Sequence, residues 1–218
     1  KAKSHDGRMI PISLVRLKSS KQDGMSKILL YAYGAYKHSV SPSFSASRFC
    51  LVDRGITFAI AHIRGGGDLG DNWHTEGKRK LKKNTFHDYI ACANHLIEQR
   101  YTHKGGLCFY GGSAGGLTGG SVANMAPELF FAMLLLVPFV DTMTTMLNEK
   151  LPLTPAEWEL WGNPIKSKEY FDYILSYSPY NNLGKKKYPP MLITSSIFDN
   201  RVLYSEPVKY IAKLRDVK

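Results

Sequence analysis

The stretch CFYGGSAGGLTGG, residues 108–120, holds a single serine among six glycines. The apolar residues before Ser113 are typical of a strand, and those after it are typical of a helix. In that context Gly111, Ser113 and Gly115 match the G-x-S-x-G pattern, which places a serine on a sharp turn between strand and helix. Such a turn needs unusual backbone angles, and glycines permit them and let a substrate approach the backbone. The stretch therefore predicts a nucleophilic Ser113 beside the first amides of a helix.

Two other interpretations start from the same glycines. A phosphate-binding loop is disfavoured because the Gly-Lys-Ser/Thr ending of such loops is absent from the stretch. A glycine-rich loop with an incidental serine stays open on these residues alone.

Apolar runs alternate with helical patterns along the rest of the chain. Six runs are typical of strands: residues 9–17, 27–36, 56–67, 107–113, 130–139 and 189–199. Helices are expected from Asn84 or Thr85 to about Arg100, over residues 117–125, and over residues 207–214. This alternation predicts an α/β fold with a mostly parallel central sheet flanked by helices. Residues 141–187, rich in Pro, Tyr, Trp and Asn, are expected to form an insertion over one end of the sheet.

Composition narrows the classes of function. The 218 residues are 44% hydrophobic and 22% charged, which is typical of one globular core. The net charge is +11, but the lysine clusters at residues 78–83 and 185–187 lack interleaved aromatics and are expected to be solvated loops. We therefore expect no nucleic-acid partner. The longest apolar run, residues 129–140, is too short to span a bilayer, so no membrane partner is expected either.

The cysteines point to a reducing compartment. Cys50, Cys92 and Cys108 are odd in number and widely spaced, which argues against both a disulfide framework and a zinc site. The first residues also show no signal peptide. These observations predict a cytoplasmic protein with free thiols and no bound metal.

Several long motifs carry a resemblance to a known family. They are YGGSAGG (110–116), HIRGGGDLGDNWHTEGK (62–78), VPFVDTMTTML (137–147), LPLTPAEWELWGNP (151–164) and YSPYNN (177–182). Together they resemble the catalytic domain of the prolyl oligopeptidase family, in particular its oligopeptidase B branch, from about His5 to the last residue. The resemblance implies an α/β-hydrolase fold, no cofactor, and a serine peptidase that cuts short peptides after Arg or Lys.

The resemblance also assigns the catalytic roles. Ser113 matches the nucleophile, and Asp199, in SIFDNRV, matches the carboxylate of the catalytic triad. Tyr33, in YAYGAY, matches a tyrosine whose hydroxyl lies in the oxyanion hole, although Ala32 replaces a glycine of the family pattern. The backbone N–H of Ala114 would be the second oxyanion donor. The alternative for Tyr33 is a core aromatic on a strand.

Substrate choice follows from the same resemblance. Glu157 and Glu159 match an acidic pair that receives a basic P1 side chain, since a buried guanidinium needs a carboxylate. Taken alone, both would be exposed helix glutamates. Arg201 matches an arginine that holds a substrate carbonyl, and Tyr36 matches an aromatic of the S1 pocket.

A second difference from the family pattern concerns P2. Ser41 and Ser43 stand where the oligopeptidase B pattern has two aspartates. This substitution leaves a preference for a basic P2 residue undecided.

The general base is the one catalytic residue for which the sequence offers no candidate. All seven histidines precede Ser113, and none matches the catalytic histidine, which in the family follows the carboxylate. We therefore expect residues 1–218 to be a partial α/β-hydrolase domain, truncated before the last strand and the histidine loop, and without the N-terminal β-propeller of the family. Alone it would be weakly active or inactive, and a complementing chain would supply the histidine segment or the propeller. The alternatives are a non-catalytic truncated fragment and a serine esterase of the same fold.

Overall fold

Six strands form the central sheet of the computed structural model, which describes residues 1–217. Their order across the sheet is β3-β5-β4-β6-β7-β8, and only β3 runs antiparallel to its neighbour. The strands are β3 (Ile12–Val15), β4 (Ile28–Tyr31), β5 (Thr57–Ala61), β6 (Leu107–Gly112), β7 (Phe130–Leu136) and β8 (Met191–Thr194). Each lies within one of the six predicted runs, so the mostly parallel α/β sheet is confirmed.

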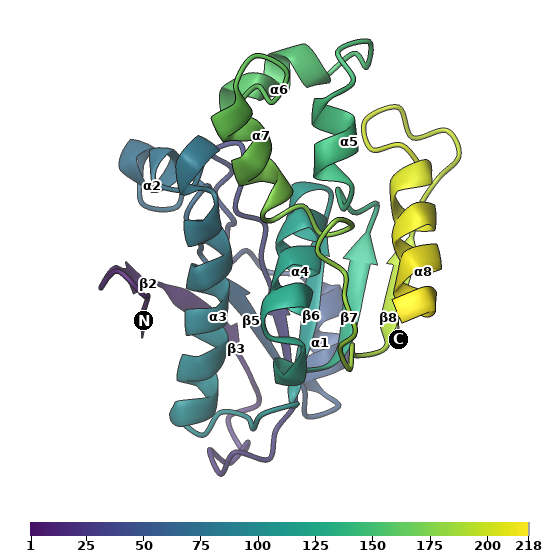
Figure 1. Cartoon of the computed structure of the whole chain (residues 1–218). Coiled ribbons are helices and arrows are strands. Elements are labelled where there is room, and N and C mark those ends of the chain that lie inside the picture. The colour runs from purple at the N-terminus through teal and green to yellow at the C-terminus, as the bar shows by residue number, and fades with distance from the viewer. Residues whose placement is uncertain (218) are drawn as a thin grey trace.

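Eight α-helices surround the sheet among the described residues. They are α1 (Ala46–Val52), α2 (Asp71–Thr75), α3 (Lys83–Glu98), α4 (Ala114–Met125), α5 (Thr142–Met146), α6 (Thr154–Trp161), α7 (Lys168–Leu175) and α8 (Ser205–Val217). Two 3₁₀ turns, Arg79–Leu81 and Pro127–Leu129, and a short hairpin of β1 (Ala2–Lys3) with β2 (Met9–Ile10) complete the chain. Helices α5, α6 and α7 belong to the predicted insertion and lie above the strand ends in Figure 1.

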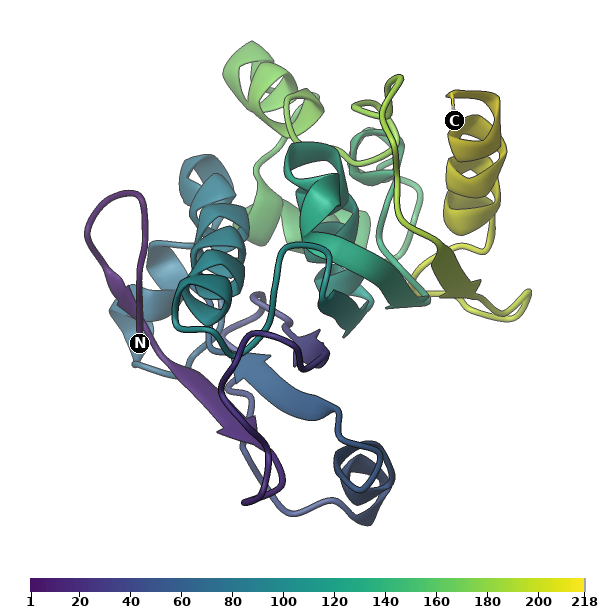
Figure 2. The same ribbon diagram turned by 90° about the horizontal axis from the view of Figure 1, so that it is seen from below.

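The two faces of the sheet are covered unequally. Helices α3, α4 and α8 pack on the face with the large core, where Phe86, Leu117 and Tyr210 are fully buried. The other face carries a small core of Leu29, Phe58, Ile60 and Cys108. Figures 1 and 2 show α1 alone behind this second face.

Helix α4 starts earlier than predicted. It begins at Ala114 rather than at residue 117, so the glycines after Ser113 lie inside the helix. They allow the helix to pack closely on its neighbours: a Cβ on Gly119 would come within 2.5 Å of Leu135 Cδ2 in β7, and one on Gly120 within 2.6 Å of Pro179 Cβ in the segment after α7. The sequence analysis assigned the glycines to the sharp turn and to substrate approach, whereas Gly119 and Gly120 allow close packing inside the helix.

Three further predictions need correction. The run 27–36 ends as a strand at Tyr31, because the chain then leaves the sheet through positive φ angles at Gly34, Tyr36 and Lys37. The predicted solvated lysine cluster is also wrong at one position: Lys82 is 1% exposed, and its Nζ donates to the Gly34 carbonyl at 2.6 Å. Helix α3, predicted from Asn84 or Thr85, begins at Lys83.

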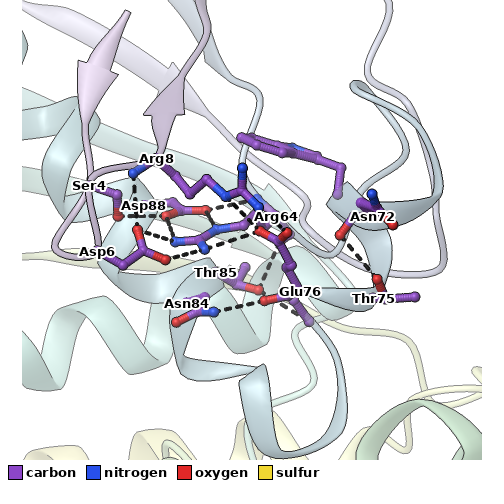
Figure 3. Close-up of polar contacts among 12 residues, drawn as sticks. Ser4, Asp6, Arg8, Arg64, Asn72, Thr75, Glu76, Asn84, Thr85 and Asp88 are labelled. Atoms are coloured by element: carbon purple, nitrogen blue, oxygen red, sulfur yellow. Dashed lines mark hydrogen bonds and ion pairs between the residues drawn. The ribbon is translucent and has the colours of Figure 1, made fainter.

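A buried ion-pair network joins the N-terminal hairpin to the sheet (Figure 3). Arg64, 1% exposed, donates from Nε to Asp88 Oδ2 at 2.8 Å and from Nη2 to Asp88 Oδ1 at 2.7 Å. Two residues of the hairpin contact the same groups. Asp6 Oδ2 accepts from Arg64 Nη1 at 2.5 Å, and the Ser4 hydroxyl donates to Asp88 Oδ1 at 2.6 Å. The Thr85 hydroxyl donates to the Arg64 carbonyl at 2.8 Å, which ties α3 to the loop after β5.

Candidate active site

Ser113 lies on the predicted sharp turn between β6 and α4. Its backbone has φ 52° and ψ −121°, a left-handed conformation that costs a non-glycine residue about 1–3 kcal/mol. The surrounding structure holds it there: the Ser113 N–H donates to Leu136 O at 2.9 Å, and the Ser113 carbonyl accepts from Phe139 N at 3.0 Å. The strained turn sits at the carboxyl end of β6, where the sheet meets the insertion.

Tyr33 and Ala114 flank this serine. The Tyr33 phenol lies close to the Ser113 side chain. Burial raises the pKa of Tyr33, and the nearby Ser113 side chain and the Arg201 charge oppose that rise only in part, so the phenol keeps its proton as a donor. Ala114 is the first residue of α4, and its N–H therefore has no acceptor within the helix.

A cleft that is open to solvent begins at Ser113 and Ala114. The side chains around it come from the loops after β4 and β7, from α5 and α6, and from the segment that joins β8 to the start of α8. They include Tyr36, Phe139, Thr145, Glu157, Arg201 and Glu206. Five of the eight predicted site residues thus line one cleft: Ser113, Ala114, Tyr36, Glu157 and Arg201.

Glu157 is one of two acidic residues that line this cleft. Its Oε1 accepts from the Tyr36 hydroxyl at 2.7 Å, and its Oε2 accepts from Trp161 Nε1 at 3.1 Å. Burial and the neighbouring Glu157 carboxylate both raise the pKa of Tyr36, so its hydroxyl is a donor at neutral pH. The carboxylate is therefore oriented by two fixed donors.

Glu159 lies apart from Glu157. Its side chain is 83% exposed and forms an ion pair with Arg79. It is absent from the lining of the cleft, because residues two apart on a helix point in different directions.

Asp199 and Arg201 follow β8 at the same edge of the sheet. Asp199 Oδ1 accepts the backbone N–H groups of Arg201 at 2.9 Å and of Val202 at 3.0 Å. Arg201 borders the cleft and also a neighbouring open hollow, which it shares with Tyr33 and Tyr36. These contacts orient the Asp199 carboxylate and bring the guanidinium beside both tyrosines.

No histidine of the described residues hydrogen-bonds to Ser113 or to Asp199. His62 Nδ1 pairs instead with Asp68 Oδ1 at 2.7 Å, and His74 Nδ1 lies 3.0 Å from Gly65 O. His38 is the one that reaches the site: its ring stands edge-on to Tyr33, with 5.3 Å between centroids. Ser41 and Ser43 border other, separate hollows on an exposed loop.

Residues that the sequence did not single out also surround the site. Glu206 and Thr145 line the cleft, and Lys82 lies behind it with Nζ 5.2 Å from the Trp161 ring. Only their packing reveals them, since no motif distinguishes them from ordinary helix or loop residues.

Comparison with known proteins places this geometry in a family. The family model described as the prolyl oligopeptidase family matches residues 42–218. The chain belongs to the prolyl oligopeptidase family. It is 48% identical over 217 residues to dipeptidyl aminopeptidase BI of Pseudoxanthomonas mexicana, and 47% identical over 217 residues to protease 2 of Moraxella lacunata. These matches take in 99% and 100% of this chain but only 30% and 31% of the relatives' length. The family and these relatives are serine peptidases.

Solved structures of related proteins have the same fold as this chain. Oligopeptidase B from Leishmania major superposes with a TM-score of 0.96 at 45% identity, over 99% of this chain and 30% of that one. Oligopeptidase B from Trypanosoma brucei, solved with covalently bound antipain, gives a TM-score of 0.96 at 46% identity and the same coverage. The α/β-hydrolase fold is therefore confirmed.

Two other observations bear on the earlier predictions. Within residues 1–217, no three His, Cys, Asp or Glu side chains come together as a metal site would require. Over the same residues, no helix combines the length and apolar character needed to cross a bilayer.

Proposed function

We propose that this chain contributes the nucleophile, the oxyanion hole and the P1 pocket of a serine peptidase that cleaves short peptides after Arg or Lys. One arrangement carries the proposal. A strained Ser113, beside the Tyr33 phenol, opens into a cleft that contains the oriented carboxylate of Glu157. The antipain bound covalently to the T. brucei oligopeptidase B supports a covalent mechanism.

In the proposed reaction Ser113 Oγ attacks the scissile carbonyl carbon while its proton passes to a general base. The carbonyl oxygen becomes an oxyanion and accepts from the Tyr33 hydroxyl and the Ala114 N–H; one such donor typically lowers the barrier by about 2.7–4 kcal/mol. The C–N bond then breaks, and the base protonates the leaving amine. Water hydrolyses the acyl ester and returns the proton to Ser113.

We propose that the general base is a histidine outside residues 1–218, carried by a further segment or by a complementing chain, and oriented by Asp199. No described histidine bonds to Ser113 or Asp199, and this supports the proposal. Residues 1–218 are then part of a catalytic domain. The three free cysteines support a reducing, cytoplasmic location.

Arg201 and Tyr36 complete the proposed substrate contacts. Arg201 would donate to a substrate carbonyl, and the Tyr36 ring would pack on the P1 stem. Glu157, between the Tyr36 hydroxyl and the Trp161 indole, would receive the cationic tip. Glu159 faces Arg79, and its part in P1 binding stays a prediction.

Labelling with a fluorophosphonate tests the nucleophile. Ser113→Ala is expected to remove labelling, while Ser47→Ala, at an exposed serine in α1, is expected to leave it unchanged. Labelling of the unmodified chain is expected to be slow and to change no more than a few-fold in any of the seven His→Ala variants. Loss of labelling in the His38 variant would place the base inside the chain, and no labelling at all would favour the non-catalytic alternative.

Specificity separates a peptidase from an esterase of the same fold. Loss of a hydrogen bond to a charged group costs about 1.5–3 kcal/mol, so Glu157→Gln is expected to weaken selection of Arg over Ala at P1 by about 10- to 100-fold. Hydrolysis of a small neutral ester is expected to be unaffected. Equal use of Arg and Ala substrates by the unmodified protein would support the esterase.

A further inference from the structure

A second carboxylate lies in the wall of the Ser113 cleft. Glu206, the second residue of α8, lines this cleft together with Ser113 and Glu157, although only 3% of the residue is exposed. Its Oε2 accepts from the Asp141 N–H at 2.9 Å, and its Oε1 accepts from the Thr145 hydroxyl at 2.5 Å. One donor is the residue just before α5, and the other lies within α5.

No cation of residues 1–217 forms an ion pair with Glu206. The nearby ammonium of Lys209 is paired with Asp141 Oδ2 instead. Burial raises the pKa of Glu206 to about 7, and the charge of Asp141 adds to that rise. A buried carboxylate without a cation is costly. A neutral glutamine could replace both bonds, by accepting from the Asp141 N–H and donating to Thr145 Oγ1, so the two bonds do not by themselves account for an acid here.

A substrate guanidinium is the cation that would pair with Glu206. Arginine presents five N–H donors, whereas each carboxylate oxygen offers about two acceptor positions. In Glu157 one position on each oxygen is already taken, by the Tyr36 hydroxyl and by Trp161 Nε1. The two that remain are too few for a desolvated guanidinium, and Glu206 offers two more in the same cleft.

We propose that Glu206 is a second specificity-determining carboxylate, which receives the guanidinium or ammonium of a basic P1 side chain together with Glu157. The inference rests on the proposed function and adds a consequence to it. Because Glu206 is partly protonated at neutral pH when the cleft is empty, a bound cation expels that proton. Affinity for a basic side chain therefore increases as the pH rises through about 7.

Other charged groups near Glu206 shape this response. Asp141 before α5 and Lys209 on α8 lie on the elements packed against Glu206. Glu157 on α6 and Arg201 after β8 lie around the cleft that Glu206 lines. Asp141 and Lys209 form an ion pair and offset one another, so neither replaces the cation that Glu206 lacks.

Calorimetric titration with benzamidine, a small amidinium, tests the inference. For a carboxyl that ionises near pH 7, the affinity is expected to increase about ten-fold from pH 6 to pH 8, with about half a proton released at pH 7. The released proton is counted by repeating the titration in phosphate and in Tris, whose ionisation enthalpies differ. Glu206→Gln is expected to bind with little pH dependence and no proton release.

Matched variants distinguish the outcomes. Glu157→Gln is expected to weaken binding at every pH while the pH dependence persists, and Glu128→Gln, at an exposed site, is expected to change nothing. Binding that needs Glu157 but has the same pH profile in Glu206→Gln would overturn the role of Glu206 and leave the proposed function standing. A lower melting temperature of Glu206→Gln with an unchanged pH profile would likewise reduce Glu206 to a structural contact of α5. Benzamidine that fails to bind the unmodified protein, or binds independently of Glu157, would overturn both.

Discussion

The buried ammonium of Lys82 leads to a testable dependence of stability on pH. Its Nζ donates to Gly34 O at 2.6 Å and to Thr85 Oγ1 at 3.1 Å, and lies 5.2 Å from the centre of the Trp161 ring. No carboxylate of the described residues is within ion-pair distance. Burial therefore lowers the pKa of Lys82 from 10.5 to about 7, and the more distant charge of Asp88 opposes this only in part.

The sign of the effect follows from these two values. Between about pH 7 and pH 10.5 the unfolded chain holds a proton on Lys82 that the folded chain has lost, so unfolding takes up protons and stability rises with pH. At about 1.36 kcal/mol for each pKa unit, the whole difference is about 5 kcal/mol. About 2 kcal/mol of it is expected between pH 7 and pH 9, a window that ends before most tyrosines ionise.

Urea unfolding at pH 7, 8 and 9 measures this change in the free energy of unfolding. Lys82→Met removes the titrating group but keeps the length of the side chain, and Lys18→Met makes the same replacement at an exposed lysine. The Lys82 variant is expected to lack the rise of about 2 kcal/mol, which the Lys18 variant keeps. The comparison uses the slope with pH, because loss of the bond to Gly34 lowers stability equally at each pH. Equal slopes in all three proteins would show that Lys82 does not titrate in this range.

Three other predictions test the packing and the site. Gly116→Ala is expected to lose about 1–3 kcal/mol in urea unfolding, because its Cβ would overlap a proline ring, whereas Gly184→Ala, with open space around it, is expected to be nearly neutral. Asp88→Asn is expected to cost about 3–5 kcal/mol by the same measurement, since it leaves the buried Arg64 guanidinium poorly paired; a loss below 1 kcal/mol would contradict this. Tyr33→Phe in the complete protease is expected to lower kcat about 10²–10³-fold with little change in KM, and an unchanged kcat would remove Tyr33 from the oxyanion hole.

The fold was predictable because its signals are local. A strand buried on both faces must be apolar throughout, so residues 107–113 and 130–139 could be assigned from composition alone. The turn at Ser113 was predictable for a similar reason, since few residues tolerate its backbone angles. The start of α4 was missed because glycine has a poor intrinsic preference for helices. At Gly119 and Gly120 that preference is overridden by contacts with Leu135 and Pro179, which are distant in sequence.

The environments of the charged residues could not be predicted in this way. Lys82 stands in a run of basic residues that suggests solvent, and it is buried because the loop after β4 and the Trp161 ring close over it. Glu157 and Glu159 look equivalent in the sequence, yet one lines the cleft and the other faces Arg79. In each case the position of a segment far along the chain decides whether a charge is solvated, paired or left unpaired. Because burial moves the pKa values of Lys82 and Glu206 close to neutrality, these two groups respond to pH in a way that a local pattern does not reveal.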